Sequence, residues 1–110
     1  MKSGLTSIER ATALIARLRM VHPRMELQTA AMFLIVAHRK EVTKPQLQTL
    51  MGMATGPAWR NLELLEELKL INVTRDGQGN TARLTPHGER FAQSLGELFD
   101  TQEGGQANGR

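Results

Sequence analysis

The sequence predicts a mainly α-helical domain that carries one small β-hairpin. Apolar residues recur at helical spacing along most of the 110 residues, which is the pattern of helices that bury one side. Two of these segments meet at Met51-Gly52-Met53, where glycine can take a positive φ and let the second helix leave at a steep angle. The stretch that follows, from Asn72 to Leu84, is typical of two short strands around a glycine-rich tip.

The first part of the chain predicts two helices. Ser7 or Thr6 can cap a helix that runs to about residue 21, and His22-Pro23 ends it because the residue before proline avoids the helical region. A second helix is expected over residues 24–39. It is apolar nearly all round from residue 30 to residue 37, so we expect it at the centre of the core. Residues 41–42 can form a short extended piece.

The helix pair around Gly52 comes next. Thr43 can cap the first of these helices, and Pro45 stands in its first turn, where proline is favoured. The second helix covers about residues 54–68. Its side expected to face inward carries Ala58, Leu62 and Leu65.

The hairpin and a last helix complete the predicted domain. Strands are expected over residues 71–75 and 81–85, and the final helix over residues 86–100. Residues 101–110 are rich in glycine and polar side chains, and we expect a disordered tail there. The length of the chain suits one domain, which we place at residues 1–100.

The composition excludes several classes of function. The absence of cysteine excludes disulfides, thiolate zinc sites and cysteine nucleophiles, and the three histidines are too scattered for a metal site. Glu63, Glu66 and Glu67 cluster without a histidine partner or a nucleophile, which favours a solvated helix face over acid–base catalysis. We therefore expect no enzyme, no cofactor and no metal. The first residues lack a secretory signal, and the longest apolar run is too short for a membrane span, so we expect a cytoplasmic protein.

Charge is unevenly distributed along the chain. Residues 1–60 carry nine Lys or Arg and three acidic residues, a balance of +6, whereas residues 61–110 carry five and eight, a balance of −3. A basic half suits a polyanionic partner, although ordinary solvated helix faces would explain the same imbalance.

The order of these elements resembles the winged helix-turn-helix of the MarR (multiple antibiotic resistance regulator) type of bacterial transcription factor. The resemblance covers about residues 25–91. The residues that carry it are the turn LQTLMG, Arg60, the helix end LLEELKLI, Asp76 in the hairpin or "wing", and LTPHG at residues 84–88. The chain departs from the family in having Ala54 where a serine-like cap is usual, followed by Gly56-Pro57. Its wing is shorter with the tip GQGN, and its terminal helices are short.

The resemblance implies that the helix from Ala54 enters the major groove of DNA. Arg60 is expected on its outward face, where arginine can pair with guanine or hold a phosphate, or instead bridge to Glu63 or Glu67. Thr55 and Gly56 stand at the start of this helix, and the threonine hydroxyl can cap the helix and touch DNA. Trp59 lies at the boundary of the face, so it either packs against the hairpin or touches the DNA.

Further contacts are expected from the flanking elements. Lys44 and Gln46 begin the supporting helix, the usual place for phosphate anchoring. Arg75 and Arg83 are expected near one another on facing strands, where they can flank a phosphate or the minor groove, or one of them can form a salt bridge with Asp76.

These observations predict a sequence-specific, DNA-binding transcriptional regulator. Repression from a palindromic operator, bound as a homodimer, is the usual arrangement in the family. The dimerisation residues are expected on the stripes of the first and last helices: Ile8, Ile15, Leu18, Phe91, Leu95 and Phe99. The alternatives are a protein-interaction module on the same scaffold and an architectural or replication-associated DNA binder. The sequence identifies no effector.

Overall fold

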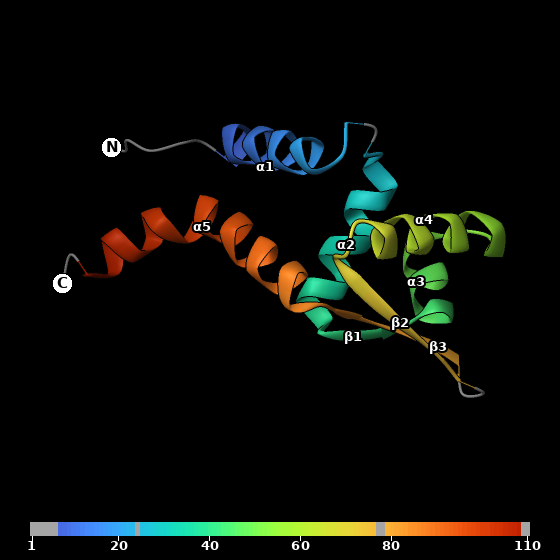
Figure 1. Ribbon diagram of the computed structural model, residues 1–110. Coiled ribbons are helices and arrows are strands. Elements are labelled where there is room, and N and C mark those ends of the chain that lie inside the picture. The colour runs from blue at the N-terminus through green and yellow to red at the C-terminus, as the bar shows by residue number, and fades with distance from the viewer. Residues whose placement is uncertain (1–6, 24, 77–78, 109–110) are drawn as a thin grey trace.

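Five helices and three strands make up the computed structural model, which describes residues 7–23, 25–76 and 79–108 (Figure 1). The side chains of residue 76 and of residues 99–108 lie outside this description. In chain order the elements are α1 Ser7–Val21, α2 Leu27–Arg39, β1 Glu41–Thr43, α3 Lys44–Met51, α4 Thr55–Glu67, β2 Ile71–Asp76, β3 Gly79–Leu84 and α5 Pro86–Asn108. The predicted fold class, mainly α-helical with a small β-hairpin, is confirmed.

The three strands form one antiparallel sheet in the order β1-β3-β2. The short extended piece expected at residues 41–42 is therefore a strand, and it pairs with β3 rather than standing alone. Ala82 of β3 lies opposite Val42 on one side and Val73 on the other, and all three side chains are buried. Because paired residues of antiparallel strands point to the same face, this row marks the face of the sheet that packs on the core.

Helix α2 lies at the centre of the core, as its apolar sequence predicts. Its Met32, Phe33 and Val36 side chains are fully buried. The Phe33 ring packs against Phe91 of α5, with ring centroids 5.7 Å apart. Helix α1 lies alongside α5 at the other end of the molecule from α3 and α4 (Figure 1).

The turn between α3 and α4 has the backbone that its glycine predicts. Gly52 ends α3 in the left-handed conformation, with φ 62° and ψ 43°, a region that costs glycine nothing. At the other end of α3, Thr43 Oγ1 accepts a hydrogen bond from the Gln46 amide at 3.2 Å, while Gln46 Oε1 accepts from the Thr43 amide at 2.9 Å. This reciprocal cap fixes where α3 begins.

A close approach of backbone joins the start of α5 to the end of α4. A Cβ atom on Gly88 would stand 2.0 Å from the carbonyl oxygen of Leu70, so only glycine fits. Thr85 Oγ1 donates to the Lys69 carbonyl at 2.5 Å and accepts from the Gly88 amide at 2.8 Å, and the Thr85 amide donates to Leu70 at 3.0 Å. The Leu-Thr-x-x-Gly sequence is therefore a junction between two elements as well as a helix start.

Some expected boundaries differ from the structure. Helix α5 continues to Asn108, although we expected it to end near residue 100 and a disordered tail to follow. Residues 101–108 contain no proline, so no residue blocks the helix outright, although Gly104 and Gly105 each disfavour it by about 1 kcal/mol relative to alanine. Helix α2 begins at Leu27 rather than near residue 24, since the Met25 amide first closes a turn onto the carbonyl of His22 at 2.9 Å.

Candidate nucleic-acid interface

Helices α3 and α4 and the β2–β3 hairpin lie at one end of the molecule, where the hairpin projects beyond the helices (Figure 1). Helix α4 contacts α2, α3 and β2. It is therefore braced on three sides, which leaves one long face for a partner.

The start of α4 is held by a glutamine of α3. Ala54 occupies the N-cap position and offers no side-chain cap. Gln48 Nε2 instead donates to Thr55 Oγ1 at 3.2 Å and lies 3.4 Å from the Met53 carbonyl oxygen. The expectation that Thr55 caps α4 is wrong, because Thr55 is the first helical residue and its hydroxyl oxygen accepts from Gln48. Sequence reasoning missed Gln48, whose partners are five and seven residues away across the turn.

The rotation of α4 about its axis is fixed by a buried polar contact with α2. Thr29 Oγ1 donates to Asn61 Oδ1, and Asn61 Nδ2 donates to the Pro57 carbonyl at 2.8 Å. Both side chains are buried. Buried polar groups are costly unless paired, so this contact favours one rotation of α4 over its neighbours.

Trp59 lies half-buried between α3 and the hairpin. The Arg75 guanidinium carbon lies 5.2 Å from the centre of its ring, and Lys44 Nζ lies 5.6 Å from it. Both distances are in the range of cation–π contacts. Of the two readings of Trp59, the structure shows packing against the hairpin.

Arg75 is also paired with Glu66 of α4. Its Nη2 lies 2.8 Å from Glu66 Oε1 and its Nη1 lies 3.2 Å from Oε2, a bidentate geometry. Glu66 Oε2 also accepts from the Val73 amide at 3.1 Å. The hydrogen bond from Arg75 is the main reason why the pKa of Glu66 lies below its ordinary value, and the same bond raises the pKa of Arg75.

Comparisons with protein families and with curated proteins find no match to this sequence. Solved structures do match. A mutant MepR from a multidrug-resistant Staphylococcus aureus isolate superposes with a TM-score of 0.75 at 16% identity, covering 94% of this chain and 77% of that one. RV1404 from Mycobacterium tuberculosis has a TM-score of 0.67 at 16% identity, with 98% and 84% of the two chains covered.

A second mutant of S. aureus MepR, bound to an oligodeoxyribonucleotide, has a TM-score of 0.72 at 17% identity and covers 93% of this chain and 76% of that one. Unmutated MepR, described as a transcription regulator of the efflux pump MepA, also matches, with a TM-score of 0.66. The chain is a winged helix-turn-helix. In winged-helix proteins the helix at the position of α4 is called the recognition helix and the hairpin at the position of β2–β3 is called the wing, and we use these two names for position only. The MarR-type resemblance is thereby confirmed at the level of the fold.

Arg60 lies exposed on the recognition helix with its guanidinium over Gly56. A Cβ atom on Gly56 would stand 3.8 Å from Arg60 Nη1, so the side chain reaches back one turn toward the start of the helix. Within the described part of the chain, Arg60 forms no ion pair with Glu63 or Glu67. The alternative reading of Arg60 as a partner of those glutamates does not hold.

The two wing arginines are not neighbours. Arg75 lies opposite Asn80, whereas Arg83 lies opposite Asn72, three pairs away. Because side chains alternate between faces, an offset of three places the two arginines on opposite faces of the wing, so they cannot flank one phosphate. Arg83 pairs with Glu41 of β1 at 3.1 Å instead, and the side chain of Asp76, the partner expected as an alternative, lies outside the described residues.

The two expected anchors on α3 have partners within the chain. Lys44 Nζ donates to Gln48 Oε1 in addition to its contact with Trp59, and the side chain of Gln46 completes the cap of α3. The structure therefore brings Lys44, Trp59 and Arg75 together and links Thr55 to Lys44 through Gln48. Gln46 serves the cap of α3, and Arg60 lies over Gly56.

The expected dimerisation stripe divides into two kinds of residue. Leu18 is 1% exposed and Leu95 is 3% exposed, because α1 packs on α5 of the same chain and both side chains join the core. Phe91 is partly buried against Phe33, and the side chain of Phe99 lies outside the described residues. Only Ile8 and Ile15, 79% and 46% exposed, offer apolar surface. Placing Leu18 and Leu95 in an interface was wrong.

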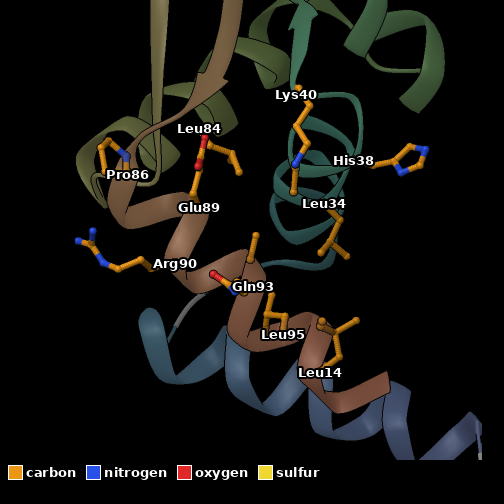
Figure 2. A pocket seen from close by; sticks show the side chains of 13 residues that line it. Leu14, Leu34, His38, Lys40, Leu84, Pro86, Glu89, Arg90, Gln93 and Leu95 are labelled. Carbon is orange, nitrogen blue, oxygen red and sulfur yellow. The ribbon is translucent and has the colours of Figure 1, made fainter. Parts of the chain in front are cut away.

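A cavity of about 740 Å³ lies between α1, α2 and α5 (Figure 2). Its apolar wall includes Leu14, Leu34 and Leu95, and Lys40, Glu89 and Arg90 supply charged groups.

The described residues contain no group of three His, Cys, Asp or Glu side chains placed to hold a metal ion. Among the described helices, none combines the length and apolar character that crossing a membrane requires.

Proposed function

We propose that this chain is a DNA-binding transcriptional regulator that reads the major groove with α4. The observation that carries the proposal is Arg60, an exposed arginine that has no acidic partner among the described side chains and lies over a glycine on the free face of the recognition helix. Arginine in this position can make two hydrogen bonds to guanine, the most common specific contact in protein–DNA complexes. The shared fold with a DNA-bound MepR mutant supports this use of the helix.

Several features of the interface support specific binding over simple attraction to a polyanion. Gln48 fixes the start of α4 and the Thr29–Asn61 contact fixes its rotation, so Arg60 is presented at a defined angle. Precise placement is what reading base edges needs, whereas phosphate attraction alone does not. Glu66 also forms an ion pair with Arg75, so the charge of one of the three glutamates of α4 is neutralised and repels DNA less.

We further propose that the protein acts as a homodimer on a palindromic operator, as a repressor. Ile8 and Ile15 of α1, two of the exposed apolar side chains of the described residues, are the ones we expect a partner to cover. A two-fold protein would place two copies of α4 on successive turns of DNA, about 34–36 Å apart. No enzymatic role is proposed.

The test is selection of bound fragments from random duplex DNA with the purified protein, followed by gel shift on the selected site. Arg60→Ala should weaken binding to that site by about 1–3 kcal/mol and relax the preference at one base pair. Arg90→Ala, which removes the same charge from α5, is the matched control and should have little effect. Failure to select any duplex would reject the proposal in favour of a protein-interaction module. Equal effects of the two variants would mean that α4 does not read the sequence.

A further inference from the structure

Four side chains from three elements form a row along the side of the recognition helix that meets α3 and the wing. Lys44 of α3 and Arg75 of the wing both contact the ring of Trp59, and Arg75 is bound in turn by Glu66. We call this group the Trp59 clamp. We propose that Glu66 and Arg75 are positioning residues, which hold the wing at a fixed angle to the recognition helix, and that Arg75 does not contact DNA. The inference rests on the proposed function and concerns how the wing takes part in it.

Glu66 binds both the backbone and a side chain of the wing. Its carboxylate accepts two hydrogen bonds from Arg75 and one from the Val73 amide. Strand β2 is at the edge of the sheet, so one row of its backbone groups has no neighbouring strand. The Val73 amide belongs to that row, because it donates to Glu66 and not across the sheet. One carboxylate thus ties the recognition helix to the free edge of the wing at two points.

The guanidinium of Arg75 already has several partners within the chain. Its Nη1 and Nη2 face Glu66, Nη1 also lies 3.2 Å from the Val73 carbonyl oxygen, and the guanidinium stands over the Trp59 ring. A phosphate brought to this group would also approach the Glu66 carboxylate, and like charges at close range repel. The Glu66 charge cancels that of Arg75, so the pair should release few counterions on binding DNA.

The direction in which Glu66→Gln changes DNA affinity distinguishes a positioning role from a purely electrostatic one. Glu66→Gln removes a negative charge from a protein that binds a polyanion, so on charge alone it should tighten binding. If Glu66 holds the wing, the same change should weaken binding because the bidentate pair is lost. Glu67→Gln is the matched control, since it removes the same charge from the next residue of α4, which is exposed.

Trp59 gives a second readout that does not depend on DNA. It is the only tryptophan of the chain, and there is no tyrosine, so its emission reports the surroundings of this one ring. Loss of the Glu66–Arg75 pair should release the cation from the ring and change the emission of the free protein. A merely stabilising ion pair far from the ring would leave the emission of the folded protein unchanged.

The experiment compares Glu66→Gln, Arg75→Gln, the double variant and Glu67→Gln, each shown to be folded by circular dichroism. On the selected duplex we expect Glu66→Gln and Arg75→Gln each to bind about three- to tenfold more weakly, the double variant to bind no more weakly than either, and Trp59 emission to shift in all three. Glu67→Gln should bind equally or more tightly without a shift. The slope of log K against log salt should stay the same in the double variant, which removes one positive and one negative charge together, whereas loss of a phosphate contact would reduce the slope by about 0.9.

Three results would overturn the proposal: tighter binding by Glu66→Gln, a shallower salt slope in the double variant, or unchanged Trp59 emission in both single variants. Absence of duplex binding by the unaltered chain is a different result. It would reject the proposed function, and with it any role of the clamp in DNA binding, while the emission measurements would still show whether Glu66 holds Arg75 at the Trp59 ring.

Discussion

Replacing Gly88 with alanine should destabilise the fold through a single steric contact. The new methyl carbon would stand 2.0 Å from the Leu70 carbonyl oxygen and 3.0 Å from its carbonyl carbon, and neither atom can rotate away because both belong to the backbone. Relief requires the start of α5 to move away from Leu70. That movement costs about 1–3 kcal/mol as overpacking, and it stretches the 3.0 Å hydrogen bond from the Thr85 amide to Leu70, worth about 1 kcal/mol more. We therefore expect a loss of about 2–4 kcal/mol.

Urea unfolding followed by circular dichroism measures this loss directly, and the midpoint should fall while the slope m stays constant. Gly56→Ala is the matched control, since it also lies in the first turn of a helix, and its Cβ atom would meet only Arg60 Nη1 at an ordinary 3.8 Å. That change should leave stability equal or raise it by up to about 1 kcal/mol. Equal stabilities of the two variants would show that Gly88 is not confined by Leu70 and would refute the reasoning.

Three further predictions concern the buried contact, the ion pair and the exposed isoleucines. Thr29→Val should cost about 1–3 kcal/mol of unfolding free energy because it leaves Asn61 Oδ1 without a donor, and an effect within the error of urea unfolding would count against the contact. The pKa of Glu66 lies below its ordinary value of 4.5 in the fold, so its pair with Arg75 stabilises the fold fully above pH 4.5 and is lost as the pH falls through the lowered value. The stability deficit of Glu66→Gln should therefore shrink as the pH is lowered from neutral through that acid range. Replacing Ile8 and Ile15 with lysine should leave the fold intact and shift sedimentation from dimer to monomer, whereas a dimer that survives both changes must use another surface.

The fold could be predicted because its signals are local. Glycine at position 52 marks a turn whatever surrounds it, and the continuous apolar run of α2 fits only a buried helix. Given the order of the elements along the chain, few ways of packing the other helices and the sheet would bury α2. The last helix was predicted too short, because its end depends on weak propensities that no strong stop signal decides.

Much of the candidate site depends on pairings that the sequence does not specify. The position of Arg83 relative to Arg75 follows from the register of the wing, and a shift of one residue exchanges the two faces of a strand. The contact between Glu66 and Arg75 joins two elements whose relative angle is a tertiary property. The burial of Leu18 likewise follows from the packing of α1 on α5, which a stripe of apolar residues cannot distinguish from packing on a second chain.

The length of α5 gives the junction at Gly88 a mechanical consequence. Its 23 residues have a contour length of about 34 Å at 1.5 Å per residue, the helix bends along its course (Figure 1), and its first turn packs directly on Leu70. The helix is thus a lever with its pivot beside the recognition helix and the wing. A swing of 10° about that pivot displaces the far end by less than about 6 Å, which is the value for a straight helix of this length. If two copies join through their terminal helices, the same swing would alter the separation of the two recognition helices by several ångströms and take them out of step with the turns of DNA.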